Sequence, residues 1–346
     1  MKNKRRWWLL AAFLLLGFAA WWYVLRTPDP RMVALAEERQ FAVPETEQIG
    51  RIFLARRDGE TINLERAGSE WRYNRKWKVR PSAMENLLDA IRRIEIQYKP
   101  PQAAVPNMVR NLATEGIKVI VYHRSGRELC TYYVGGSTPD ERGTFVIKEG
   151  YDQPYVAYLP GWEGNLRFRY NLKGEDWRDR AVFAENPDGI QELRIEYPLQ
   201  RSMSFILEKK KSGFEVRPFF PTTRRIVAPL SPGAAEAFLV GFESLSAEAF
   251  RNDYTHRDSV RQLIPFAIIS LRRSDGSRKE VRFFPIQPAP VEVDPKTEQL
   301  PGNNEIERFF ASDSAGDFFL VQNRVFKKVF WGYPFFFSDI KATDYQ

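Results

Sequence analysis

One helical pattern occurs twice in the chain: residues 81–94 read PSAMENLLDAIRRI, and residues 232–245 read PGAAEAFLVGFESL. The apolar side chains of the first copy recur at the spacing of one helix face: Met84, Leu87, Leu88, Ile91 and Ile94. Ser82 and Glu85 have the spacing of a capping box, and Ser231 can cap the second copy with Pro232 in the first turn. Each stretch therefore predicts an amphipathic helix that packs its apolar stripe on a sheet.

The two copies belong to a longer internal repeat. At an offset of 151 residues, five positions align with residues of similar character: Pro81, Glu85, Leu88, Ile91 and Ile94 with Pro232, Glu236, Leu239, Phe242 and Leu245. Residues 109–112 align with residues 260–263 at the same offset. At an offset of 150, the alignment continues with Val119, Val121, Gly126 and Tyr133 on Ile269, Leu271, Gly276 and Phe283. An offset held across two helices and a hairpin indicates a tandem duplication.

Alternating apolar residues predict strands around these helices. Asp58-Gly59 and Ser212-Gly213 lie between such runs and predict hairpins before each helix. Strands are also expected after each helix, at 117–123, 129–134, 143–147 and 154–159 and then at 266–271, 280–284, 318–322 and 325–330, with a short helix at 304–310. The predicted fold class is α+β, with an N-terminal transmembrane helix followed by two tandemly duplicated lobes of antiparallel sheet with packed helices.

The N-terminus has the pattern of a membrane anchor. Basic residues in the segment 1–6 precede an uncharged run, residues 7–25, that is roughly 28 Å long as a helix, about the thickness of a bilayer core. Tryptophans stand at both ends of this run, where interfacial aromatic residues are typical. By the positive-inside rule, the N-terminus is cytoplasmic and the bulk of the chain periplasmic, in a single-pass protein of the inner membrane. A cleaved signal peptide is the alternative, although its apolar region is normally only about 7–15 residues long.

This pattern and the repeat together divide the chain. The expected parts are a cytoplasmic basic tail, the anchor in the lipid bilayer, a juxtamembrane linker, a first α+β repeat, and a second repeat with a proline-rich insertion at 285–302: residues 1–6, 7–25, 26–40, 41–175 and 176–346. The formal net charge is +8, but four of the basic residues lie in the tail and the others are interspersed with acidic residues. No nucleic-acid partner is therefore predicted.

No pattern in the chain predicts a catalytic, cofactor or metal site. His123, His256 and Cys130 lack partners at metal-ligand spacing, and no phosphate-binding loop, dinucleotide fingerprint or nucleophile elbow occurs. The stretch 133–140 contains the adjacent glycines Gly135 and Gly136, whose small size allows a ligand to approach the backbone. The candidates for contact with a ligand or partner are Gly135, Gly136, Asp140, Arg169 and Tyr170. The same residues also fit ordinary loops between strands.

Several short motifs resemble a known bacterial family. They include Phe41-Ala42-Val43, Tyr132-Tyr133-Val134-Gly135-Gly136, Pro160-Gly161 and Asp317-Phe318-Phe319-Leu320-Val321-Gln322, so the similarity extends over nearly the whole chain. The pattern is similar to the family catalogued as domain of unknown function four-three-four-zero, common in Bacteroidota. This resemblance implies an exported, membrane-tethered envelope protein, because some relatives are encoded beside or fused with ABC-type export or gliding machinery. It supplies no catalytic residues.

These observations favour a function without catalysis. We expect a membrane-tethered periplasmic binding or scaffold protein, auxiliary to an ABC-type export or envelope-assembly complex, with a ligand that the sequence does not specify. Two alternatives stay open. One is a hydrolase that acts on an envelope polymer through unassigned carboxylates, which should converge in a cleft with shifted pKa values. The other is a glycan-binding module, which should present exposed tryptophan or tyrosine side chains along a groove.

Overall fold

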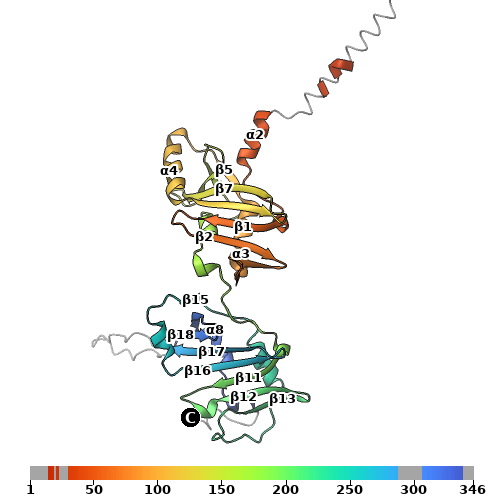
Figure 1. Ribbon diagram of the computed structural model, residues 1–346, viewed down its shortest axis with the longest axis vertical. Helices are drawn as coiled ribbons and strands as arrows, with labels where there is room; N and C mark the ends of the chain where they lie inside the picture. The colour runs from red at the N-terminus through yellow and green to blue at the C-terminus, as the bar shows by residue number, and fades with distance from the viewer. Residues whose placement is uncertain (1–14, 19–20, 23–29, 287–305, 338–346) are drawn as a thin grey trace, which may run out of the picture. The chain divides into compact units, whose positions relative to one another are not determined.

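The computed structural model describes residues 15–18, 21–22, 30–286 and 306–337. The chain forms two compact units, Met1–Asp179 and Arg180–Gln346, each built around one large antiparallel sheet (Figure 1). The boundary expected from the sequence lay between residues 175 and 176. The predicted α+β class, with mostly antiparallel strands, is confirmed.

The first unit has a nine-stranded sheet in the order β4-β3-β2-β1-β6-β7-β8-β9-β5. Helix α2 (Pro30–Arg39) precedes the sheet. The strands are β1 Ile49–Ala55, β2 Thr61–Ala67, β3 Glu70–Tyr73, β4 Trp77–Lys78, β5 Glu95–Tyr98, β6 Ile117–His123, β7 Glu128–Ser137, β8 Thr144–Lys148 and β9 Tyr155–Tyr158. The further helices of this unit are α3 Pro81–Arg93, α4 Val105–Glu115 and α5 Arg167–Tyr170.

The second unit has an eight-stranded sheet in the order β13-β12-β11-β16-β17-β18-β19-β15, together with a two-stranded pair, β10 and β14. The strands are β10 Ala181–Phe183, β11 Ile190–Glu196, β12 Phe205–Lys210, β13 Gly213–Pro218, β14 Leu245–Ser246, β15 Ala249–Phe250, β16 Ala267–Arg273, β17 Arg278–Pro285, β18 Arg308–Asp313 and β19 Phe318–Gln322. The helices are α6 Ala234–Val240, α7 Arg257–Arg261 and α8 Asn323–Phe326.

The two sheets have matching topologies. Apart from the short edge strand β4, each strand of the first sheet has a counterpart at the same place in the order of the second. The pairing of β1 with β6 is interrupted by an irregularity between Ile49 and Arg51, and the pairing of β11 with β16 is interrupted between Ile190 and Glu192. The agreement therefore extends to local defects as well as to strand order.

Hydrogen bonds outside the strands also match. The N–H of Arg80, just before α3, donates to the carbonyl of Trp177 at 2.9 Å. The N–H of Ser231, which is 151 residues after Arg80, donates to the carbonyl of Phe336 at 2.8 Å. Each of these bonds joins the chain before the helix to a 3₁₀ turn near the end of its unit.

A β-bulge changes the alignment of one predicted pair. The sequence offset placed Tyr133 on Phe283, but the strand pairing places Val134 opposite Ile117 and Phe283 opposite Ala267. The register of β7 shifts between the partners of Val121 and Tyr122, which inserts an extra residue into that strand. Val134 is therefore the counterpart of Phe283, and both side chains are fully buried.

Each unit buries a helix against the apolar face of its sheet. Helix α3 buries Ala83, Met84, Leu87, Ala90 and Ile91 in the core of the first unit, and α6 buries Ala235, Phe238 and Leu239 in the core of the second. Leu88, expected in the middle of the stripe, is only partly buried. The predicted caps are wrong, since the residue before α3 is Arg80 and no side chain caps the helix. Proline at the first position of α3 suits a helix start without a cap.

The second unit departs from the prediction in three elements. Helix α6 covers only Ala234–Val240 of the expected 232–245, because Gly233 has a φ of 74° and breaks the helical path. Residues 308–310, expected in a helix, begin strand β18, which pairs with β17. Residues 325–330, expected as a strand, form the end of α8 and a 3₁₀ turn. A strand at 325–330 would have to pair with β19, but that edge of β19 is already occupied by β15.

Two predicted segments lie mostly outside the described residues. Only residues 15–18 and 21–22 of the anchor at 7–25 are described, and they are helical. Among the described residues, no helix combines the length and apolar character needed to cross a membrane. Of the insertion at 285–302, only Pro285, at the end of β17, and Ile286 are described.

The packing of α3 leads to a prediction about stability. Leu87→Ala should lower the free energy of unfolding of the first unit by about 2–5 kcal/mol, because it removes a fully buried side chain and leaves a cavity. The matched variant Leu88→Ala should cost only about 1 kcal/mol, because Leu88 is partly exposed. Hydrogen exchange at the amides of β1 and β6 measures this energy within one unit. Equal costs for the two variants would contradict the observed orientation of α3.

Candidate functional site

Gly135 and Gly136 lie inside strand β7 and not in the expected loop. A β-carbon on Gly135 would lie 2.8 Å from Asn111 Oδ1 and 3.0 Å from Leu112 Cδ2, and one on Gly136 would lie 2.9 Å from Asn111 Nδ2. The N–H of Gly136 donates to Asn111 Oδ1 at 2.6 Å. Neither glycine has a positive φ. The two glycines therefore allow α4 to approach the sheet closely, which accounts for them without a ligand.

Asp140 lies in the turn between β7 and β8 and holds that turn closed. Its Oδ1 accepts hydrogen bonds from Thr138 Oγ1 at 2.5 Å and from the N–H of Arg142 at 3.2 Å. The hydrogen bond from Thr138, followed by that from the Arg142 backbone, lowers the pKa of Asp140. Thr138 Oγ1 in turn accepts from the N–H of Gly143 at 2.9 Å. All of these contacts are local to the turn.

Arg169 and Tyr170 belong to the short helix α5 and point into the first unit. Tyr170 is fully buried, its hydroxyl lies 3.1 Å from that of Tyr132, and burial raises its pKa. Arg169 is 6% exposed, and its Nη1 donates to Asp89 Oδ2 at 2.6 Å. Its guanidinium lies 5.0 Å from the ring centre of Trp162. The indole of Trp162 is 44% exposed, so it covers the ion pair from the outside.

The five candidate residues make separate contacts and do not line any of the hollows described below. Arg167 Nη1 donates to the carbonyl of Gly135 at 2.9 Å, which links α5 to β7. Arg169 instead reaches Asp89 on α3.

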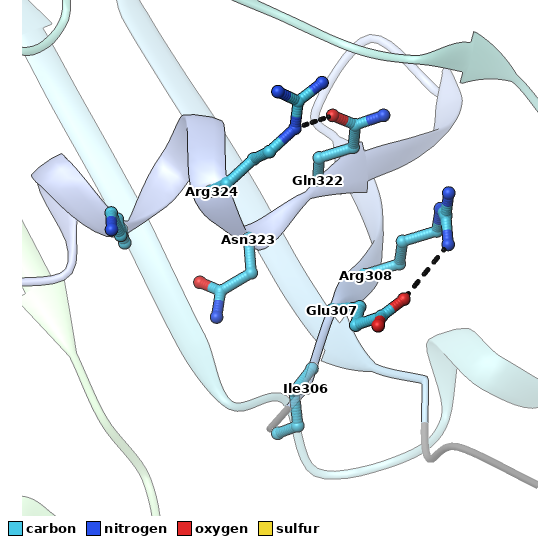
Figure 2. Close-up of a pocket in the computed structure, with 7 residues that line it drawn as sticks. Ile306, Glu307, Arg308, Gln322, Asn323 and Arg324 are labelled. Carbon is cyan, nitrogen blue, oxygen red and sulfur yellow. Dashed lines mark hydrogen bonds and ion pairs between the residues drawn. The ribbon is translucent and has the colours of Figure 1, made fainter. Parts of the chain in front are cut away.

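The largest of the hollows, about 420 Å³, lies between the start of β18 and helix α8 (Figure 2). Arg308 Nη1 lies 3.5 Å from Glu307 Oε2, and Arg324 Nε donates to Gln322 Oε1 at 2.7 Å. Arg308 and Gln322 also donate to Glu248, and these hydrogen bonds, that from Gln322 first, hold the pKa of Glu248 below its usual range. With Lys327, the lining has more basic than acidic side chains.

A second hollow, about 380 Å³, lies over β1, β2 and β6 of the first unit. Arg51 stacks its guanidinium 3.8 Å from the ring centre of Tyr122, and Arg66 and Arg124 are also in the lining. Glu65 accepts hydrogen bonds from Asn63 and Arg75, which hold its pKa low against the opposing effect of burial. Basic side chains again outnumber acidic ones.

Two adjoining hollows, of about 350 and 360 Å³, lie on the sheet of the second unit and share Glu280 and Ser314. Their lining comes mainly from outward positions of β11, β16 and β17, where arginine and glutamate alternate with buried apolar residues. These charged residues were not among the site candidates predicted from the sequence. The signal present in the sequence was the excess of arginine at alternating strand positions.

The side chains that could bind a metal or act as a nucleophile do not cluster in the part of the chain that the structure describes. Among residues 15–18, 21–22, 30–286 and 306–337, no group of three or more His, Cys, Asp and Glu side chains could hold a metal ion. His123 Nδ1 lies 2.8 Å from Ser125 Oγ in a hairpin. Burial raises the pKa of the Cys130 thiol to about 11, so this side chain is protonated at neutral pH and is a poor nucleophile.

Asp313 differs from the other carboxyl groups in the described part of the chain in the direction of its pKa shift. The pKa of Asp313 is raised, chiefly by burial and also by the charge of Asp317, whereas every other resolved shift of a described carboxyl group is downward. Asp313 Oδ1 accepts hydrogen bonds from the N–H groups of Ala315 and Asp317 at 3.0 and 2.9 Å. The side chain thus closes the hairpin between β18 and β19 at the edge of a hollow.

By fold, the chain is an α+β protein with two large antiparallel sheets of matching strand order. Comparisons with models of known protein families, with curated proteins and with solved structures found no match.

The ion pair of α3 and α5 predicts a pH-dependent stability. Partial burial alone would raise the pKa of Asp89, but hydrogen bonds from Arg169 and Arg93 lower it. A lowered pKa in the folded state stabilises the protein above the unfolded pKa of about 3.9 and ceases to do so as the pH falls through the folded value. Asp89→Asn should therefore destabilise the first unit at pH 7 by about 1–2 kcal/mol, a value discounted for the partial exposure of Asp89.

The destabilisation by Asp89→Asn should disappear as the pH falls through the lowered pKa of Asp89, because Asp89 of the wild type then also loses its charge. Urea unfolding of wild type and variant at pH 7 and in acid measures the difference. Glu85→Gln, on an exposed position of the same helix, is the matched control and should have little effect at either pH. A difference that persists unchanged in acid would show that packing, and not charge, is what the substitution disturbs.

Proposed function

We propose that the chain is a membrane-tethered binding or scaffold protein of the cell envelope, with both units in the periplasm. The carrying observation is the N-terminal pattern, in which a basic segment precedes the uncharged residues 7–25 flanked by tryptophans. The resemblance to the family of unknown function four-three-four-zero supports the same placement. It also supports a role beside an ABC-type export or envelope-assembly complex.

The surface of the two units supports binding over catalysis. Three of the hollows have polar and charged side chains in their linings, and in each of them basic side chains outnumber acidic ones. Such surfaces are suited to recognising acidic groups by charge and hydrogen bonding. The proposed partner or ligand is therefore acidic.

The matching topologies support a tandem duplication as the origin of the two units. Strand order, the irregularity in the first strand pairing and the hydrogen bond ahead of the main helix all recur. A duplication produces two copies of one fold, and the residues on their outward faces can then change independently. In this proposal, the units differ in what they contact and not in how they fold.

The proposed topology can be tested directly. A reporter enzyme that is active only outside the cytoplasm should be active when fused after Gln346, and the full-length chain should remain with membranes after washing with salt or alkali. Cross-linking in intact cells should join the chain to proteins of the envelope. Recovery of the full-length chain in the soluble cytosol would end this proposal.

One observation favours the alternative of a hydrolase. Asp313, whose pKa is raised chiefly by burial, lines the same hollow as Glu280. Acid–base hydrolysis uses two carboxyl groups in different environments at one site. If this alternative holds, Asp313→Asn should reduce hydrolysis of an envelope polymer at least about a hundredfold. Asp275→Asn is the matched control, since Asp275 closes the hairpin between β16 and β17 but has a lowered pKa. Equal effects of the two variants would reject the hydrolase.

A further inference from the structure

The outward face of the second sheet carries an ordered array of charges, which we call the arginine face and define as Glu192, Arg194, Arg272, Arg278, Glu280 and Arg282. The neighbouring residues on the same strands are buried in the core: Leu193, Ile195, Ile269, Leu271, Val281 and Phe283. Because side chains alternate between the two sides of a strand, this burial places the charged residues together on the other side. Four arginines there face two glutamates.

Two of these arginines form an unfavourable pair. Arg272 on β16 lies directly opposite Arg278 on β17. Side chains in such a pair start about 5 Å apart, and like charges in this position destabilise a sheet. The Arg272–Arg278 pair does not stabilise the sheet, so a bound ligand of negative charge would lower the repulsion between the two side chains.

The two glutamates of the arginine face do not neutralise all four arginines, because Glu192 is shared between Arg272 and Arg194 and Glu280 is engaged by Arg282. Glu192 lies opposite Arg272 on the other side, and its carboxylate is 3.6 Å from Arg272 Nη2 and 2.8 Å from Arg194 Nε. Glu280 pairs with Arg282 at 3.0 Å and accepts a hydrogen bond from Ser270 Oγ at 3.2 Å. The side chain of Arg278 is exposed and has no ion-pair or hydrogen-bond partner among the residues that the structure describes. Its guanidinium is free to bind a ligand.

Space for a ligand lies beside this pair. Arg194, Arg272 and Arg278 line the hollow of about 360 Å³, which is in the range of small-molecule sites, and Ser270 is also part of its lining. The adjoining hollow adds Arg282 and Arg261, whose Nε donates to Ser312 Oγ at 2.9 Å. Basic side chains therefore line both hollows, which meet at Glu280 and Ser314.

The first unit shows that the fold does not require opposed arginines. At the matching positions of its sheet, Arg51 lies opposite Tyr122, and Tyr122 lies opposite Glu128. Arg51 stacks on the ring of Tyr122, with 3.8 Å between the guanidinium and the ring centre, and no like charges face each other at these matching positions. The first sheet opposes like charges only near its edge, where Arg72 on β3 lies opposite Lys78 on β4. Opposed arginines at the matching central positions are therefore found in the second unit and not in the first.

We propose that the arginine face binds a phosphate monoester, with Arg272 and Arg278 bracketing the phosphoryl group and Arg194 at the side of the hollow. A guanidinium presents two N–H groups that match two phosphoryl oxygens. A phosphoryl group with a charge near −2 balances the excess of four arginines over two glutamates on the arginine face. The same chemistry is found in a soluble phosphate ester and in a phospholipid headgroup. The inference rests on the binding role proposed above but does not depend on the membrane tether.

The test uses the full-length chain in detergent and isothermal titration calorimetry. The two probes are glycerol 3-phosphate and short-chain phosphatidic acid, with short-chain phosphatidylcholine as the control lipid that lacks a monoester. The wild type should bind at least one phosphate monoester saturably and should not bind phosphatidylcholine. Arg278→Gln should weaken this binding about tenfold or more, the effect of losing one charge-assisted contact.

Two further measurements separate a binding role from a structural one. Unliganded Arg278→Gln should melt no lower than the wild type, because the substitution relieves the repulsion with Arg272. Arg127→Gln removes the same charge from an exposed position in the matching hairpin of the first unit and should leave binding unchanged. Tighter binding of phosphatidic acid than of glycerol 3-phosphate assigns the ligand to lipid, and equal binding assigns recognition to the phosphoryl group alone.

The proposal is overturned if neither monoester binds saturably, or if Arg127→Gln weakens binding as much as Arg278→Gln, which would indicate attraction by overall charge. Either result leaves the reporter and membrane-fractionation experiments unaffected. A failure of this inference is therefore distinguishable from a failure of the proposed topology.

Discussion

Both units depend on one constraint, which is the burial of one face of an antiparallel sheet under packed helices. Leu87 of α3 and Phe238 of α6 are fully buried against their sheets. Because side chains alternate along a strand, a shift of one residue in any pairing would expose the whole apolar set of that strand. The core therefore determines the register of the strands. The residues on the outward face are not restrained by core packing and can vary, provided that they stay polar.

The repeat shows what that freedom allows. The units share strand order, a matching irregularity in the first strand pairing and the hydrogen bond that precedes the main helix. On this shared frame, the first unit places Tyr122 between Arg51 and Glu128, and the second places Arg272 between Glu192 and Arg278. The difference in charge is confined to positions that the core does not restrain, which is where divergence in binding is least costly to folding.

Sequence patterns succeeded where they extended over many residues and failed for short segments. The strand pattern at 117–123 and the helix at Pro81–Arg93 were long enough to reveal their period. Residues 308–310 and 325–330 are short apolar runs that fit a helix or a strand equally well. The former became a strand because β17 offers a free edge for pairing, and the latter did not because β15 already pairs with β19.

For the candidate sites too, some features follow from the sequence and others only from the tertiary structure. The sequence by itself determined the alternation that sends Arg272 and Arg278 to one side of the sheet, the glycines at 135 and 136, and the repeat that makes the two units comparable. Only the tertiary structure decided that the glycines allow α4 to approach, that Arg169 is held by Asp89, and that Arg272 and Arg278 face each other. The physical reason is that each of these contacts joins strands or helices whose register depends on the core, and no local pattern encodes that register.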